Sequence, residues 1–210
     1  MPKQIGPKGQ TAGSGFGPQP ARRPPFDRVT IGLHWATALL VLTMFMSAWL
    51  RLLSHDDVTR AVLLHSHRSV GLALWIMTAG RLAWRLTNAK LPPFPAGITK
   101  AQRRFIHFSE YGLYILLLGQ PATGLGVTLL SGRPFALFAM QFAPLMPQDT
   151  ALWEMFRQAH YLSAWALGAL VAIHAISGLV HHFVLHDDVL ECMAPLIAVA
   201  PGTGITPTPS

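Results

Sequence analysis

The chain has 210 residues, of which 51% are hydrophobic and 12% charged, and its formal net charge is +7. This balance is too apolar for an ordinary soluble domain and indicates an integral membrane protein. The basic residues lie in tails and loops between apolar runs, which argues against a nucleic-acid-binding face. The single cysteine, Cys192, excludes a disulfide framework and a cysteine-rich metal site.

Four apolar segments are long enough to cross a bilayer as helices. We expect them at about 29–50, 64–86, 105–130 and 159–185, within one domain that covers 27–193. Residues 1–26 are rich in Gly, Pro and basic residues, and 194–210 in Pro and Thr, so both tails are expected to be disordered. Pro121 is expected to kink the third segment. The apolar stretch FALFAMQFAPLMP is too short to span, and we expect it to lie at the membrane interface or to cap the bundle.

The placement of Lys and Arg predicts the orientation. The N-terminal tail and the second loop, counted with the end of the second segment, carry eleven of the sixteen basic residues. With four spans these regions lie on one side of the membrane, and the positive-inside rule places that side in the cytoplasm. The predicted fold is therefore an all-α, four-helix membrane bundle with both termini cytoplasmic.

Histidines inside the segments fall into two layers. His160 and His174 are 14 residues apart in the fourth segment, so they share a helical face and lie about 21 Å apart along its axis. Because the spans alternate in direction, His34 lies at the inner level of His174, and His67 at the outer level of His160. Two imidazoles that face each other across a bundle can hold a haem iron on both axial sides. We expect two haems, bound by the pairs His34/His174 and His67/His160.

Other interpretations of these histidines stay open. The alternative for the four is that they are hydrogen-bonded packing residues or line a polar cavity. His65 and His67 are alternative ligands for the outer layer. Because residues two apart point to different sides of a helix, only one of them can face the bundle, and we choose His67. His107 is the reserve candidate for the inner layer, with an interfacial position as its alternative. The small residues expected to leave room for the cofactor are Gly32, Ala36, Gly71, Ser163, Gly168 and Gly178.

Several short motifs carry a resemblance to a known family. They are LHW at 33–35, HRSVG at 67–71, RLAWRL at 81–86, AHYLSAW at 159–165, and IHAISGLVHHF at 173–183 followed by HDDVL. In this order and spacing the chain resembles the bacterial cytochrome b561 family of di-haem inner-membrane cytochromes over about 27–193. The resemblance implies haem b ligation by His34, His67, His160 and His174. It also implies respiratory electron transfer with ubiquinone, and in at least one type superoxide as the electron donor at the outer face.

Arginines near each layer are candidates for binding haem propionates. Arg81 and Arg85 follow His67 by about 14 and 18 residues, so they share its face but lie at the inner level. A guanidinium binds a carboxylate with two hydrogen bonds, which suits a propionate of the inner haem. The alternative is that they anchor the helix at the cytoplasmic surface. The outer-face candidates, for propionates or for steering an anionic substrate, are Arg68, Arg133 and Arg157, with solvated loop charge as the alternative for Arg133.

His181 is the candidate catalytic residue. It lies seven residues after His174, nearly on the same face and near the inner surface. There it is expected to hydrogen-bond a quinone carbonyl or to pass a proton during quinone reduction. The alternative is an interfacial pair with His182 that contacts lipid headgroups. Glu110 is a candidate for the proton path, or else a charge at the start of a helix.

The sequence therefore predicts a di-haem b cytochrome of the bacterial inner membrane that moves single electrons between an outer donor and ubiquinone. The donor is a small anion or a protein, and a superoxide:quinone oxidoreductase activity is one option. The lipid membrane is a partner and nucleic acid is not. Two alternatives remain: a cytochrome b anchor subunit of a larger dehydrogenase or hydrogenase-type complex, and a haem-free proton or ion transporter that uses the same histidines.

Overall fold

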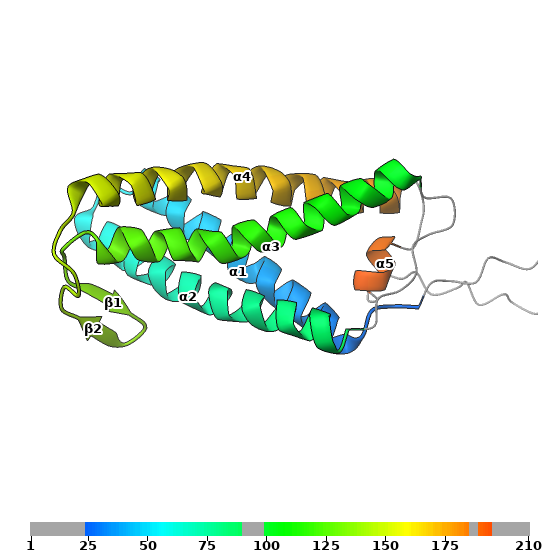
Figure 1. Ribbon diagram of the computed structural model, residues 1–210, viewed down its shortest axis with the longest axis horizontal. Helices are drawn as coiled ribbons and strands as arrows, with labels where there is room; N and C mark the ends of the chain where they lie inside the picture. Colours follow the sequence, from blue (N-terminus) through cyan, green and yellow to red (C-terminus); the bar gives the residue numbers. More distant parts are fainter. Residues whose placement is uncertain (1–23, 90–98, 185–188, 195–210) are drawn as a thin grey trace, which may run out of the picture.

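Four long helices make up most of the molecule, which is described by a computed structural model. The structure describes residues 24–89, 99–184 and 189–194. Its elements are α1 (Arg28–Leu53), α2 (Asp57–Thr87), α3 (Lys100–Leu129), β1 (Phe135–Leu137), β2 (Met140–Phe142), α4 (Thr150–Phe183) and α5 (Val189–Met193). α1 packs along α2, α3 packs along α4, and α2 also contacts α3 (Figure 1). Residues 1–23 and 195–210 of the predicted tails lie outside the described residues.

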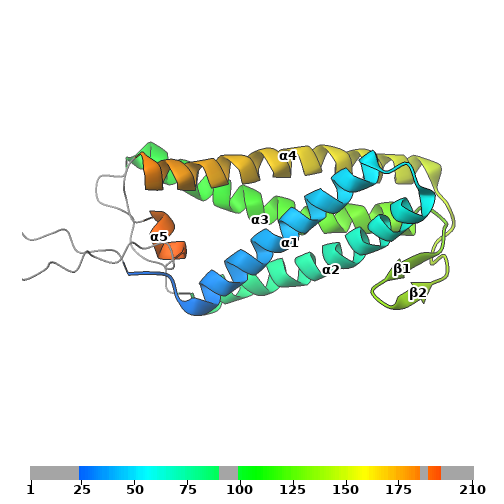
Figure 2. The same cartoon turned by 180° about the vertical axis from the view of Figure 1, so that it is seen from behind.

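The two ends of the bundle differ. β1 and β2 lie at one end, which we call the hairpin end (Figure 1). α5 lies at the opposite end, which we call the α5 end, near the start of α1 and the end of α4 (Figure 2). The backbone N–H of Phe26 donates to the Cys192 carbonyl at 3.1 Å, and Trp35 Nε1 donates to the Met193 carbonyl at 3.0 Å. α5 is therefore fastened to the beginning of α1.

Polar side chains cap the starts of the long helices. Asp27, Asp56 and Asp149 each precede a helix, and each carboxylate accepts a hydrogen bond from the backbone N–H three residues later. Hydrogen bonds from the hydroxyl and the backbone N–H of Thr30 hold the pKa of the Asp27 carboxyl below its usual range. The caps fix where each helix begins, whatever the hydropathy of its first turns.

These caps shift two of the predicted boundaries. The apolar runs begin at about 64 and 159, but α2 begins at Asp57 and α4 at Thr150, because polar capped turns precede the apolar residues. Pro121 lies inside α3, which bends in its middle part (Figure 1). Proline has no N–H for the carbonyl four residues earlier, which weakens the helix at this point.

The predicted all-α class needs one correction, because FALFAMQF contains an antiparallel hairpin in which Leu137 pairs with Met140. Phe138 in the turn has a φ of +52°, a left-handed conformation that strains a non-glycine residue. Its N–H donates to Ser69 Oγ at 2.7 Å, and His65 Nε2 donates to its carbonyl at 2.7 Å. Contacts to α2 thus hold the strained turn, and local hydropathy did not reveal them.

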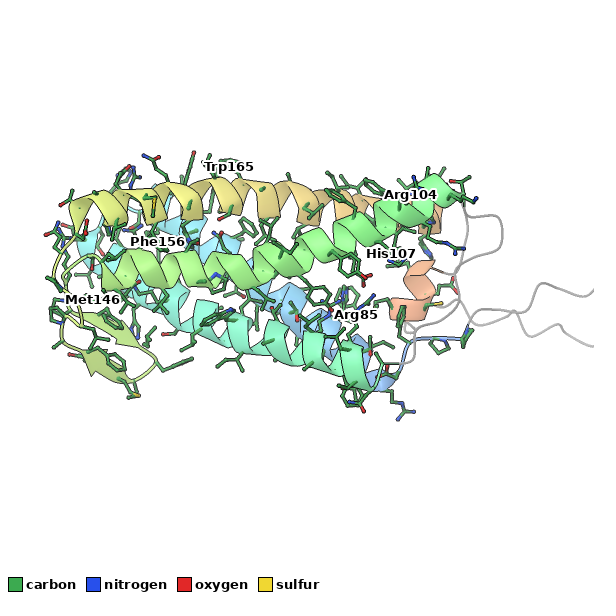
Figure 3. The ribbon with its side chains drawn as sticks, viewed as in Figure 1. Arg85, Arg104, His107, Met146, Phe156 and Trp165 are labelled. Carbon is green, nitrogen blue, oxygen red and sulfur yellow. The ribbon has the colours of Figure 1, made fainter. Side chains whose placement is uncertain are left out.

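Three of the long helices, α1, α3 and α4, are long and apolar enough to cross a membrane, with mean hydropathies of 1.8, 1.3 and 1.7. α2 is not among them; it carries five charged side chains and two histidines. Large apolar side chains cover the outside of the bundle; Leu39 and Trp165, for example, are both 64% exposed (Figure 3). An apolar exterior around polar interior residues is typical of a protein embedded in lipid, so the chain is a membrane protein.

One buried apolar layer joins the long helices midway along the bundle. It takes one side chain from each helix: Val41, Leu74, Leu117 and Leu167. Leu167 lies seven residues from both His160 and His174, which places the layer between the two histidine levels.

We expect Leu167→Ala to lower the free energy of unfolding by about 2–5 kcal/mol, because truncating a buried leucine leaves a cavity. Thermal unfolding of the purified protein in detergent measures the change. Leu162 lies on the same helix but is 65% exposed, so Leu162→Ala serves as the matched control. Equal loss of stability in the two variants would contradict the central role of the layer.

Candidate functional site

Two pairs of histidine rings face each other inside the bundle, one pair near each end. At the α5 end, the ring centroids of His34 on α1 and His174 on α4 are 6.1 Å apart, with an interplanar angle of 57°. At the hairpin end, the centroids of His67 on α2 and His160 on α4 are 6.4 Å apart, with an angle of 80°. The structure therefore brings together the four histidines that the sequence analysis selected, in the same two pairs.

The ring separations fit a single metal atom between the two rings of each pair. A metal ion holds an imidazole nitrogen at about 2 Å, and the ring centroid lies about 1 Å behind that nitrogen. Two rings on opposite sides of one metal atom therefore have centroids about 6 Å apart. Within the described part of the chain, no hydrogen bond joins the two rings of either pair, so direct bonding does not explain their approach.

The number of ligands also limits the kind of metal centre. Among the described residues, no group of three or more His, Cys, Asp or Glu side chains converges on one point. Each pair can therefore supply two ligands on opposite sides of a metal atom. A haem fits this donor set, because its porphyrin occupies the remaining four positions around the iron.

A glycine of α3 makes room for the ring of His160. A Cβ atom added to Gly124 would lie 3.0 Å from His160 Cε1, closer than almost all real contacts of this kind. The sequence analysis did not select Gly124, because only the packing of α3 against α4 shows which glycine faces the ring. Gly71 and Gly168, which it did select, lie instead against side chains of α1.

Three further histidines of the described residues lie apart from the two pairs. His65 is turned toward the hairpin, where it bonds to the Phe138 carbonyl. His107, at the α5 end (Figure 3), stacks on Tyr111 with ring centroids 6.2 Å apart. His182 packs against Phe183 with centroids 4.8 Å apart.

His181 lines a pocket of about 360 Å³ between the start of α3 and the end of α4. The other lining residues are Ala101, Gln102, Phe105, Ile106 and Ser177. Apolar walls with a few polar groups are the usual composition of a site for a small organic ligand. On α4, the lining residues Ser177 and His181 lie about one and two helical turns beyond His174.

Arg81 lies beside His34. Its Nη2 atom is 3.0 Å from His34 Nδ1, and its guanidinium carbon lies 5.7 Å from the centre of the Tyr114 ring. Because a guanidinium can only donate, His34 Nδ1 accepts this hydrogen bond and the ring proton is on Nε2.

Arg85 already forms an ion pair with Glu110. Its Nη2 atom donates to Glu110 Oε2 at 2.7 Å, and its Nη1 atom pairs with the other carboxylate oxygen (Figure 3). Both side chains are about one-quarter exposed. Of the two arginines at this level, Arg81 is therefore the better placed to receive a further anion.

A second pair of arginines lies near His67 at the hairpin end. Arg51 Nε is buried and has no hydrogen-bond partner among the described residues. Arg51 and Arg68 are close enough for their charges to repel, and both act electrostatically on His67. A partly buried cation normally has an anion as partner, so this pair is a candidate anion site. The sequence analysis selected Arg68 but not Arg51.

The other two outer-face candidates lie elsewhere. Arg157 Nε donates to Glu154 Oε2 at 2.7 Å, and its guanidinium carbon lies 5.7 Å from the centre of the Trp153 ring. Arg133 is exposed in the turn that precedes β1. Neither has the unmatched, partly buried position of Arg51.

A membrane helix bundle with facing histidine pairs has the architecture of a b-type cytochrome. Residues 25–195 match the family described as prokaryotic cytochrome b561, and the chain belongs to this family. It is 28% identical to cytochrome b561 homolog 2 of Escherichia coli K12, over 79% of this chain and 88% of the relative. Identity to cytochrome b561 homolog 1 of the same strain is 27%, over 81% and 97%. Identity to the probable superoxide oxidase CybB of Yersinia pestis is 24%, over 81% and 96%.

The family membership establishes the general class of activity. Members bind b-type haem, and this protein is a membrane b-type cytochrome that transfers electrons. The haem number, the ligands and the partners are matters for the proposal below.

We expect Gly124→Val to lower the haem content of the purified protein, because the added side chain collides with the His160 ring. The pyridine haemochrome spectrum per chain measures the loss. Gly119 on the same helix has nothing within 4 Å of an added Cβ, so Gly119→Val is the matched control and should retain its haem. Unchanged haem content in the Gly124 variant would show that the ring tolerates displacement.

Proposed function

We propose that this protein is a di-haem cytochrome that carries single electrons across a bacterial inner membrane, from an outer donor to ubiquinone. His34 and His174 bind one haem b, and His67 and His160 bind the other. The observation that carries this proposal is the separation of the two ring pairs, 6.1 and 6.4 Å, in a family that binds b-type haem.

The proposal includes α2 as a fourth span. Its 31 residues have a length of about 46 Å, which exceeds the thickness of a hydrocarbon core. Arg81 and Arg85 are directed to His34 and Glu110 inside the bundle, where their charges avoid lipid. With four spans, the basic residues of the described chain at the α5 end, among them Arg28, Lys100 and Arg103, support a cytoplasmic position for that end.

The residues of this chain have distinct roles toward the cofactor. Haem, when bound, supplies the one-electron redox chemistry. To bind iron through Nε2, His34 carries its proton on Nδ1, and Arg81 can then no longer donate to that atom. Arg81 is thereby released to bind a propionate carboxylate with two hydrogen bonds. Arg51 and Arg68 have the corresponding role at the hairpin end.

The pocket at His181 is the proposed ubiquinone site. A quinone carbonyl can accept hydrogen bonds from His181 and from Gln102 or Ser177, while Phe105 and Ile106 contact the apolar part. Reduction of ubiquinone to ubiquinol takes two electrons and two protons. His181 is suited to deliver protons, because an imidazole ring can donate a proton at one nitrogen and accept one at the other.

Superoxide is the proposed outer donor. Each superoxide ion gives up one electron and leaves as dioxygen, so two ions supply the electrons for one ubiquinone. Arg51 and Arg68 would attract this anion toward His67. The name of the Yersinia relative, probable superoxide oxidase, supports the same choice.

We expect two haem b per chain in the wild-type protein and one in either His174→Ala or His160→Ala, because each change removes a ligand from one layer only. Reduced-minus-oxidised spectra and haem quantification per folded chain measure this. Loss of both haems from one of these variants, in protein that still folds, would contradict the two-layer pairing.

We expect His181→Ala to keep both haems but to slow the reduction of a ubiquinone analogue, because the pocket loses its hydrogen-bond donor and proton carrier. The effect expected for one such group is about 10²–10⁴-fold. His182→Ala is the matched control, since its ring packs against Phe183. Equal slowing in both variants would assign the effect to the interface rather than to the pocket.

A further inference from the structure

The two histidines at the hairpin end have the same kind of contact behind their rings. His67 Nδ1 lies 3.0 Å from the hydroxyl oxygen of Ser47 on α1. That hydroxyl donates to the carbonyl of Met44, three residues earlier on the same helix, at 2.9 Å. Because a serine hydroxyl has one proton, Ser47 Oγ is left to accept from His67 Nδ1–H.

His160 has the equivalent contact on α3. Its Nδ1 atom lies 3.0 Å from Thr123 Oγ1 and 3.1 Å from the carbonyl oxygen of Gln120. The Thr123 hydroxyl donates to the same Gln120 carbonyl, again three residues earlier, at 2.8 Å. A carbonyl can only accept, so His160 Nδ1 carries the proton.

Both contacts leave Nε2 as the unprotonated nitrogen that can bind a metal; in His160 this atom accepts a long hydrogen bond from Gln120 Nε2, at 3.4 Å. A metal-bound histidine that donates its other N–H to an oxygen is held in one tautomer and orientation, and becomes a stronger electron donor. Stronger donation stabilises oxidised iron over reduced iron, which lowers the midpoint potential.

The pair at the α5 end lacks these acceptors. His34 Nδ1 faces the guanidinium of Arg81, which is a cation and a donor. Among the described residues, the ring of His174 makes no hydrogen bond. Within this part of the chain, therefore, neither ring at the α5 end has an oxygen acceptor of the kind that Ser47 and Thr123 supply.

We propose that Ser47 and Thr123 are positioning residues that hold His67 and His160 as Nδ1–H tautomers and give the haem at the hairpin end the lower of the two midpoint potentials. This inference rests on the proposed di-haem function and adds a direction to it. Electrons that enter at the hairpin end then pass downhill to the α5 end, where the His181 pocket lies.

Ser47→Ala in the full-length, haem-loaded protein tests the role of the hydroxyl. Redox titration should resolve two midpoint potentials, of which one is higher than in the wild-type protein and the other is unchanged. Contacts of this kind typically change metal-site properties about tenfold or more, and a tenfold change in a one-electron reduction equilibrium is about 59 mV. Ser47→Thr keeps the hydroxyl and should restore the wild-type value. Thr43→Ala removes an exposed hydroxyl of α1 that bonds only to the Leu39 carbonyl, and should leave both potentials unchanged.

Thr123→Val gives a second measurement. A backbone carbonyl remains near each ring, that of Gln120 at His160 and that of Met44 at His67, so the same midpoint potential should rise in both variants. Low-temperature EPR of the oxidised protein should show a changed signal for one haem only. If Ser47→Ala loses its haem, the Thr123→Val variant provides the test. A higher midpoint potential in that variant supports the inference, and an unchanged midpoint potential overturns it.

The order of the two potentials is tested separately. In His174→Ala, which should retain only the haem of the hairpin end, the remaining potential should match the lower wild-type component. A match to the higher component would overturn the proposed direction. Retention of two haems with unchanged potentials in Ser47→Ala would overturn the role of Ser47 while leaving the proposed function intact. A wild-type protein that binds no haem would instead contradict the proposed function itself.

Discussion

The separation of about 6 Å between facing imidazole rings is the constraint on which the bundle depends. Each ring pair joins the α1–α2 hairpin to the α3–α4 hairpin, so the helices stay apart at both levels. Direct apolar contact is then concentrated midway, where each long helix contributes one buried residue. A repeat of seven residues keeps these features on one face: His67, Leu74 and Arg81 on α2, and His160, Leu167, His174 and His181 on α4.

Several polar groups inside this apolar bundle are held by specific partners. Lipid provides no hydrogen bonds, so an interior donor or acceptor without a partner would be costly. Arg85 is matched by Glu110 across α2 and α3, and the hydroxyls of Ser47 and Thr123 bond to their own helices while contacting histidine rings. These contacts also fix ring orientation, which links the energetics of burial to the properties of the metal site.

The two ends of the bundle suit different partners. At the hairpin end, Arg51 and Arg68 are two neighbouring cations near a histidine pair, which favours a small anion. At the α5 end, an acid already matches Arg85, and the largely apolar pocket at His181 favours a lipid-soluble molecule. This asymmetry is consistent with the proposed direction of electron transfer.

The sequence by itself determined the membrane class, the approximate apolar segments, the two histidine levels and the family resemblance. Hydropathy and helical periodicity are local properties, so they can be read without knowing how helices pack. Tertiary structure decided that Gly124 faces His160, that Arg85 meets Glu110, that Arg51 lies near Arg68, and that Ser47 and Thr123 stand behind the rings. It also placed the β1–β2 hairpin on α2, where Ser69 and His65 hold a strained turn. Each of these contacts depends on the register between two elements distant in sequence, and no local pattern specifies that register.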